Sequence, residues 1–401
     1  MSFRSVAAFA AFSLLSACGT GPDTQLGQNG ATASVFGYAV ADEPQAALVA
    51  RQVLNEGGNA ADAAAAAGFA LSVTLPSRAG LGGGGACIVK MPPQAPVAIL
   101  FPPGAPASSS GARPAAIPTM ARGLLALQAR YGVLPAASVI APAERLAGDA
   151  SVSPALESDL QVVGSALLDD PSAAAIFAPN GSLLPTGGNL VQPDLAATLE
   201  VLRTQDVQGF YAGGFAQQFV AGADAAGGGL STADLDDATP KFVTPVLGSE
   251  DHFDTAMLPT SPADGQALPA SAGFAVLDKN GGVVACTVTM NNLFGTGRIA
   301  TGTGVLLAAS PRTGPTPQLA AGIAYQPGSM KFRAAATGTG EAGAADAART
   351  ALADALAQSQ AQAQALVPAP GRANVISCPG GDGACSAQAD PRGQGLAVGG
   401  P

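Results

Sequence analysis

The chain has 401 residues, enough for one large domain or two ordinary ones, and its 48% hydrophobic content allows a sizeable core. Its formal net charge of −10 argues against nucleic acid or an anionic lipid surface as an electrostatic partner. The single histidine, His252, lies in a polar run, where a surface position is expected. With one histidine, the chain cannot form a histidine-rich metal site. Because the chain also has no Cys-x-x-Cys pair, we expect neither a metal nor a cofactor.

The first residues have the pattern of a secretory signal peptide. Arg4 supplies a basic start, and an apolar stretch, too short to span a membrane, leads to small residues before Cys18. The ending Leu-Ser-Ala-Cys resembles the bacterial lipobox, in which the cysteine is lipidated; the alternative is an ordinary signal peptide with a chance cysteine. We expect a signal peptide over 1–18, a polar tether over 19–34, and lipid on Cys18. This predicts a protein anchored to the membrane in the bacterial cell envelope, facing the periplasm or the exterior.

Residues 55–91 predict a helix, a turn, a glycine run and a strand. Residues 60–73 are almost all apolar and compatible with a helix, with Asn59 before them as a cap and Pro76 after them as a stop. Residues 82–85 are four glycines, which allow a close backbone approach before a buried strand over 86–91. The glycines lack the Lys-Ser/Thr of a P-loop, and they follow the helix instead of preceding it as in a Rossmann fingerprint. The run is therefore not a phosphate-binding loop.

The middle of the chain predicts amphipathic helices, and the last third predicts strands. Helices are expected within 115–131, 134–160 and 190–213, and Ser231 and Thr232 are capping residues ahead of Asp234. Alternating residues predict antiparallel strands over 274–277 and 283–290, joined by a turn over 279–282. A helix rich in alanine and glutamine is expected over 344–366.

Four cysteines remain after Cys18. Cys378 and Cys385 close a short glycine-rich loop, and we expect a disulfide between them, because an envelope compartment permits one. Cys87 and Cys286 each lie in a predicted strand and either pair across a sheet or remain buried thiols.

These motifs together resemble the gamma-glutamyltransferase family. The resemblance starts at GGNAADAAAAAGFALSVTLPSRAGLGGGGACIVKM and continues in order through LVQPDLAATLEVL, GFYAG, the hairpin SAGFAVLDKNGGVVACTVTMNNLFGTG and the closing ADPRGQGLAVGG. It spans roughly 36–400, except that a long helical section of the family, after residues 258–266, has no counterpart. The resemblance implies an α+β fold, a four-layer αββα sandwich of the N-terminal-nucleophile hydrolase type, as a single domain over 35–401.

The same resemblance implies the chemistry. Members of the family cleave their own chain to expose a threonine, which then transfers or hydrolyses γ-glutamyl groups. Ser271 stands at the nucleophile position, so cleavage is expected between 270 and 271; its freed α-amine would then serve as the base. Thr289 falls on the family's second threonine and Asn291 on its substrate-binding asparagine, and the oxyanion pair corresponds to Gly343 and Ala344. Judged without the resemblance, Ser271 is a turn serine, Thr289 a strand threonine and Asn291 a turn asparagine.

The chain departs from the family where the amino-acid head of the substrate is bound. The arginine that pairs with the substrate carboxylate is replaced by Pro102, and the acidic residue that holds its amine by Thr313. The Thr-His pair after the nucleophile is Ala272-Gly273, and the family's paired serines are replaced near Arg333 and Ala334. The first hypothesis is therefore a gamma-glutamyltransferase-like enzyme that acts on a small γ-glutamyl or related amide through an acyl-enzyme on Ser271. The alternatives are a related amidase with a different substrate and a non-catalytic envelope lipoprotein that keeps the sandwich as a binding or structural module.

Overall fold

A computed structural model describes residues 34–108, 111–259, 270–314, 316–357, 367, 369–379 and 385–400. Its first sheet is antiparallel and has the strand order β17-β1-β9-β10-β2-β3-β6. The strands are β1 (Ser34–Ala41), β2 (Gly84–Lys90), β3 (Val97–Phe101), β6 (Lys241–Val243), β9 (Ser271–Asp278), β10 (Val283–Thr289) and β17 (Leu396–Gly400). The predicted hairpin is therefore the centre of this sheet.

The second sheet is also antiparallel, with the order β16-β15-β14-β13-β8-β7. Its strands are β7 (Val246–Glu250), β8 (Phe253–Met257), β13 (Ala320–Tyr325), β14 (Phe332–Thr339), β15 (Arg372–Ser377) and β16 (Ser386–Gln388). Side chains of both sheets, among them Ala275 and Leu277 of β9 and Ile323 of β13, form one buried cluster between them. The two sheets thus pack face to face.

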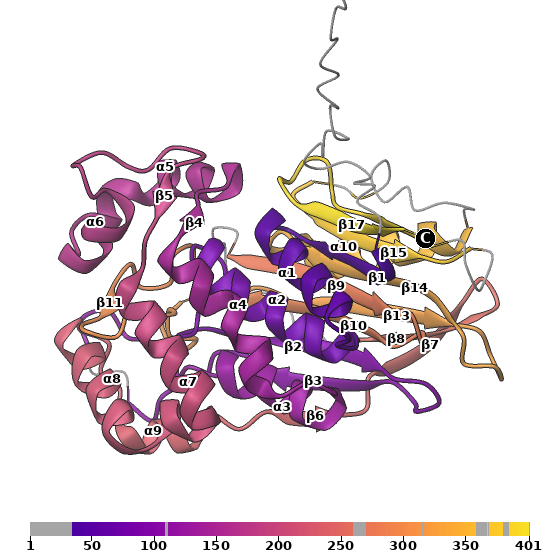
Figure 1. Cartoon of the computed structure of the whole chain (residues 1–401), viewed down its shortest axis with the longest axis horizontal. Coiled ribbons are helices and arrows are strands. Elements are labelled where there is room, and N and C mark those ends of the chain that lie inside the picture. Colours follow the sequence, from indigo (N-terminus) through magenta and orange to yellow (C-terminus); the bar gives the residue numbers. More distant parts are fainter. Residues whose placement is uncertain are drawn as a thin grey trace, which may run out of the picture.

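Helices cover the outer face of each sheet (Figure 1). On the first sheet lie α1 (Pro44–Asn55), α2 (Ala60–Thr74) and α3 (Met120–Tyr131), and α4 (Ala136–Gly148) packs on α2. On the second sheet lies α10 (Ala344–Ala357), preceded by the short η1 (Glu341–Gly343). This arrangement confirms the predicted four-layer αββα sandwich.

The remaining elements gather to one side of the sandwich in Figure 1. They are the helices α5 (Pro154–Leu167), α6 (Pro171–Phe177), α7 (Pro193–Tyr211), α8 (Gly213–Ala225) and α9 (Thr232–Asp236), with the short strand pairs β4 (Ala150–Ser151) with β5 (Asn189–Leu190) and β11 (Ile299–Ala300) with β12 (Val305–Leu306). The helices predicted from the middle of the chain are confirmed, and Ser231 caps α9 through a capping box with Asp234.

The helix α2 and the glycine run fold as the sequence predicts. Asn59 and Asp62 form a capping box at the start of α2, and all of its 15 residues are buried, which suits a helix that is apolar all round. Gly84 opens β2, where an added Cβ would collide with the Phe101 carbonyl oxygen; at Gly85 it would lie 2.5 Å from that of Thr287. The glycines are needed because neighbouring backbone leaves no room for a side chain.

Both cysteine pairs are joined in the structure. Cys87 and Cys286 lie directly opposite each other on β2 and β10 and form a disulfide, which answers the question that the sequence left open. A second disulfide links Cys378 and Cys385.

Some of the sequence-based predictions fall on residues outside the described ranges, and others concern the surface. The signal peptide, Cys18 and the tether up to residue 33 lie outside the described residues, as do residues 358–366 of the expected helix over 344–366. His252 is exposed in the turn between β7 and β8, as predicted. Within the described ranges, no helix is long and apolar enough to cross a membrane.

Candidate functional site

Ser271 is the first residue of the central strand β9. Residues alternate in direction along a strand; Phe274 and Val276 pack under the helices, whereas Ala275 and Leu277 face the second sheet. Ser271 shares the face of Ala275, so its side chain points between the two sheets. It is 2% exposed, and its Oγ is buried without a hydrogen-bond partner in the described part of the chain.

The carbonyl just before Ser271 is held by two donors. Ser271 pairs with Thr289 across the hairpin, and the Thr289 hydroxyl donates to the Ala270 carbonyl oxygen at 2.8 Å. The backbone N–H of Met290 donates to the same oxygen at 3.3 Å. Such donors polarise a carbonyl and stabilise negative charge that develops on its oxygen.

Asn291 fixes the direction of the Thr289 hydroxyl. Its backbone N–H donates to Thr289 Oγ1 at 2.8 Å, so the hydroxyl proton is left to face Ala270. The Asn291 side chain donates through Nδ2 to the Ala309 carbonyl at 2.8 Å, and its φ of 62° is the left-handed conformation that asparagine tolerates. The structure thus brings together three of the site residues predicted from the sequence: Ser271, Thr289 and Asn291.

A buried threonine opposite β9 was not predicted. Thr337 of β14 lies across from Gly273, where an added Cβ would be 2.5 Å from its Oγ1. This hydroxyl is fully buried and, within the described residues, has no hydrogen-bond partner. Thr337 therefore occupies the space that a side chain at position 273 would need.

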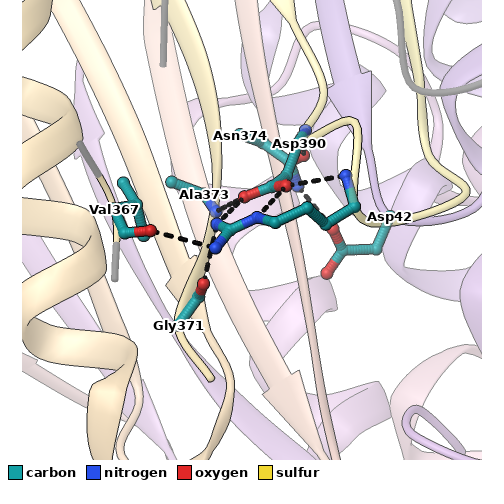
Figure 2. A network of polar contacts seen from close by, with 7 residues as sticks. Asp42, Val367, Gly371, Ala373, Asn374 and Asp390 are labelled. Atoms are coloured by element: carbon teal, nitrogen blue, oxygen red, sulfur yellow. Dashed lines mark hydrogen bonds and ion pairs between the residues drawn. The ribbon is translucent and has the colours of Figure 1, made fainter. Parts of the chain in front are cut away.

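A polar network that was also not predicted holds the start of β9 through Gly273. Figure 2 shows Asp42, Asn374 and Asp390 of this network. Asp42 accepts the Gly273 N–H through Oδ2 at 2.8 Å, and Asn374 of β15 donates to Asp42 Oδ1 at 2.8 Å. The Asn374 side-chain oxygen accepts the N–H of Asp390 at 3.4 Å, and Asp390 is paired with Arg392 at 2.5 Å. Asp390 and Arg392 belong to the ADPR segment that carried part of the resemblance, but no local pattern marked Asp42 or Asn374.

Two carboxyl groups, the partly buried Asp42 and the fully buried Glu43, lie at the same end of β9. Burial raises the pKa of Asp42, against the opposing effects of the Gly273 N–H, Asn374 and the cations Arg78 and Arg372. Burial also raises the pKa of Glu43, which is fully buried. Glu43 Oε2 accepts the Thr74 hydroxyl at 2.7 Å, and its Oε1 is without a partner in the residues described.

Gly343 and Ala344 lie where β14 leads into α10. The Gly343 N–H donates to the Gly340 carbonyl at 3.1 Å, and Ala344 is the first residue of α10. No hydrogen bond in the described chain joins either residue to Ser271, so their role as an oxyanion pair stays a prediction.

The two positions at which the resemblance predicts charged substrate-binding residues, Pro102 and Thr313, are both exposed. Pro102 follows β3, and its carbonyl accepts the Thr119 hydroxyl at 3.1 Å. The Thr313 N–H closes a turn onto the Ser310 carbonyl at 3.2 Å. Neither side chain has a charge to offer a substrate. In addition, no group of three or more His, Cys, Asp or Glu side chains among the described residues is placed to hold a metal ion.

Comparisons with known proteins agree with this fold. The glutathione hydrolase proenzyme of Escherichia coli K12 is 32% identical over 251 residues, which cover 57% of this chain and 43% of that protein. The acylase ACY 1 proenzyme of Pseudomonas sp. V22 is 30% identical over 238 residues, covering 53% and 43%. The chain thus spans less than half the length of these relatives. A crystal structure of cephalosporin acylase from Bacillus halodurans superposes with a TM-score of 0.77 at 18% identity, covering 100% of this chain and 99% of that one, which shows a shared fold.

The family model described as Gamma-glutamyltranspeptidase matches residues 46–268, more than half of the chain. This matched range includes the capped helix α2 and the glycine run, and it ends just before Ser271. The chain belongs to the gamma-glutamyltranspeptidase family.

Proposed function

We propose that this protein is a self-processing N-terminal-nucleophile hydrolase that cleaves itself between Ala270 and Ser271 and then acts on a small amide through Ser271. The observation that carries the proposal is the pair of donors on the Ala270 carbonyl oxygen, Thr289 Oγ1 at 2.8 Å and the Met290 N–H at 3.3 Å. They lie on the one peptide bond whose cleavage would free the amine of Ser271. The names of the relatives, which are proenzymes of a hydrolase and an acylase, support the same reading.

Self-cleavage needs no group beyond the chain and water. Ser271 Oγ attacks the Ala270 carbonyl carbon, the carbon–nitrogen bond breaks, and the acyl group moves to the oxygen as an ester, while the hydroxyl proton passes to the freed amine. Water then hydrolyses the ester and leaves a carboxylate on Ala270 and a free amine on Ser271. During the attack the charge on the carbonyl oxygen is stabilised by Thr289 and Met290.

The second reaction uses the new amine as the base. The amine takes the proton of Oγ, Oγ attacks the amide of the substrate, and the leaving amine departs with that proton. The acyl group on Ser271 then passes to water or to an acceptor amine. Our first candidate substrate is a γ-glutamyl amide, the class that the family resemblance implies.

A second candidate is an amide whose acyl group has no free amino-acid head. Pro102 and Thr313 favour it, because they stand where the resemblance expects an arginine and an acid, and both are exposed and uncharged. Losing a hydrogen bond to a charged group costs recognition on the order of 1.5–3 kcal/mol. Release of the chromophore from a γ-glutamyl anilide supports the first candidate; release only from a simple acyl anilide supports the second.

Electrophoresis of the purified chain tests the proposal. We expect two fragments that meet between 270 and 271, and a single chain for Ser271→Ala. A parent chain that stays intact would contradict the proposal and favour a non-catalytic binding or structural module.

We also propose that lipid on Cys18 anchors the protein in the cell envelope, on the sequence pattern alone. The Cys18→Ser variant should then move from the membrane fraction to the soluble fraction. If it stays with the membrane at the parent level, the proposed anchor is wrong.

A further inference from the structure

Where the β1–β9 ladder ends, the side chains of Asp42 and Asn374 form hydrogen bonds to the backbone of β9. The last register pair of this ladder is Ala41 with Phe274. One residue further, the Asp42 N–H donates to the Gly273 carbonyl at 3.0 Å, and its side chain accepts the Gly273 N–H at 2.8 Å. Asn374 Nδ2 donates both to that carbonyl, at 3.1 Å, and to Asp42 Oδ1, at 2.8 Å. Both backbone polar groups of Gly273 are therefore held, two residues from Ser271.

We propose that Asp42 and Asn374 are positioning residues that hold the start of β9 so that the Ser271 hydroxyl can attack the Ala270 carbonyl. This inference rests on the self-cleavage proposed above. It assigns to these two residues a role that neither the family motifs nor the predicted site residues include.

The contact also fixes the two sheets to each other at this end. Asp42 directly follows β1 of the first sheet, whereas Asn374 lies on β15 of the second, where it pairs with Thr337. Asn374 is itself held, since its side-chain oxygen accepts the N–H of Asp390 (Figure 2). Asp390 is buried and paired with Arg392, whose guanidinium also donates to two backbone carbonyls, those of Val367 and Gly371. The amide of Asn374 therefore has one direction available: its nitrogen faces Asp42 and Gly273.

Such a contact controls the alignment of the Ser271 hydroxyl with the Ala270 carbonyl. A hydroxyl next to its own peptide bond reacts only if strand and carbonyl are aligned, and a displacement of about 1 Å can slow a reaction about 10²-fold. Thr289 fixes the carbonyl from one side of β9, and the Asp42–Asn374 pair fixes the backbone from the other. Stability alone is a weak reason for this arrangement, because a partly buried carboxylate costs desolvation that an apolar pair of similar shape avoids.

The test compares variants at the two ends of β9. Asp42→Ala and Asn374→Ala remove the contacts at the Ser271 end. Asp278→Ala is the matched control: it removes a buried carboxylate that accepts backbone N–H groups at the other end of the same strand. The rate of self-cleavage is followed by electrophoresis below the melting temperature of each variant, and folding is checked by circular dichroism. We expect both test variants to slow cleavage about 10²-fold and the control to cleave at the parent rate.

A conservative variant separates positioning from general stability. Asp42→Asn keeps an oxygen that can accept the Gly273 N–H, whereas Asp42→Ala leaves that N–H without its acceptor. We expect Asp42→Asn to cleave faster than Asp42→Ala. If an alanine variant does not fold, Asp42→Asn is compared with Asp278→Asn, its matched control at the other end of β9, and Asp42→Asn is expected to cleave more slowly than that control.

The outcomes distinguish a failure of this inference from a failure of the proposed self-cleavage. Folded alanine variants that cleave at the parent rate, a control that slows as much as its test variant, or an Asp42→Asn variant no faster than Asp42→Ala would overturn the inference while self-cleavage stands. A parent chain that does not cleave, like Ser271→Ala, would overturn both.

Discussion

The two ends of β9 both bury polar side chains, but the hydrogen bonding of these side chains differs between the ends. At the end near the turn, Asp278 is buried, and its hydrogen-bond partners in the described residues are backbone donors: Oδ1 accepts the N–H groups of Asn280 and Gly282, and Oδ2 accepts the first N–H of α2, from Ala60. At the other end, Ser271 Oγ and Thr337 Oγ1 are buried, and neither has a partner within the described chain. Oε1 of Glu43, the residue after Asp42, is also buried without a hydrogen-bond partner in the described chain.

The difference supports the proposal that the Asp278 end is structural and the Ser271 end reacts. Each buried polar group without a partner costs about 1–3 kcal/mol, so a fold rarely gathers several of them without a reason. Local violations of good packing are expected at functional sites. Asp278 joins a turn to a helix, whereas the Ser271 end keeps hydroxyls free beside a polarised carbonyl.

The largest effect expected from a substitution at the Ser271 end is on Thr289. Thr289→Val removes the hydroxyl that donates to the Ala270 carbonyl, and we expect self-cleavage to slow about 10²- to 10³-fold, the cost of one lost oxyanion donor. Thr289→Ser is the control, because it keeps the hydroxyl. Time courses of cleavage measured by electrophoresis decide; equal rates for Thr289→Val and the parent would show that this donor has no part in the reaction.

A smaller effect is expected from filling the space at Gly273. The Cβ of Gly273→Ala would lie 2.5 Å from Thr337 Oγ1, so we expect a loss of about 1–3 kcal/mol in the free energy of unfolding. Thr337→Ala removes that oxygen, and the double variant should recover part of the loss. Urea unfolding of the four chains forms a double-mutant cycle. Strictly additive effects would mean that the two residues do not meet.

The opposite end should respond in stability only. Asp278→Ala removes the acceptor of the Ala60 N–H at the start of α2, and we expect a loss of about 0.5–2 kcal/mol, as for a helix cap. Urea unfolding measures this loss, and electrophoresis should show self-cleavage at the parent rate. A strong fall in cleavage with intact folding would remove the contrast between the two ends.

The smallest expected effect depends on pH. Burial raises the pKa of Glu43, so the folded chain binds its proton more tightly than the unfolded chain does. The free energy of unfolding therefore falls as the pH rises from the ordinary glutamate pKa, about 4.3, through the raised one. Glu43→Gln keeps an oxygen for the Ala46 N–H and the Thr74 hydroxyl but carries no charge. Its melting temperature should exceed that of the parent at pH 7, and the gain should vanish below about pH 4; a gain of equal size at both pH values would exclude titration of Glu43 as the cause.

Much of the scaffold could be predicted because its signals are local. The capping box of α2, the glycines before β2 and the turn between β9 and β10 are each written within a few neighbouring residues. The pairing of Cys87 with Cys286 could not be decided from the sequence, because it depends on which strands become neighbours.

The site could be predicted only in part, for the same reason. Ser271, Thr289 and Asn291 lie in one hairpin and its following turn, so one motif contains them. Asp42 and Asn374 are 332 residues apart in the chain and meet only because β1 and β15 close on the same end of β9. Thr337 was missed because a threonine in a buried strand has no distinctive spacing. The family match ends at residue 268, so it identifies the scaffold and leaves the reacting residues to be tested.

The most direct test of the central claim is the intact mass of the purified parent chain beside that of Ser271→Ala. We predict that the parent gives two polypeptides, one ending at Ala270 and one beginning at Ser271, and that the variant gives one. A parent chain of a single mass that matches the uncut polypeptide would contradict the account.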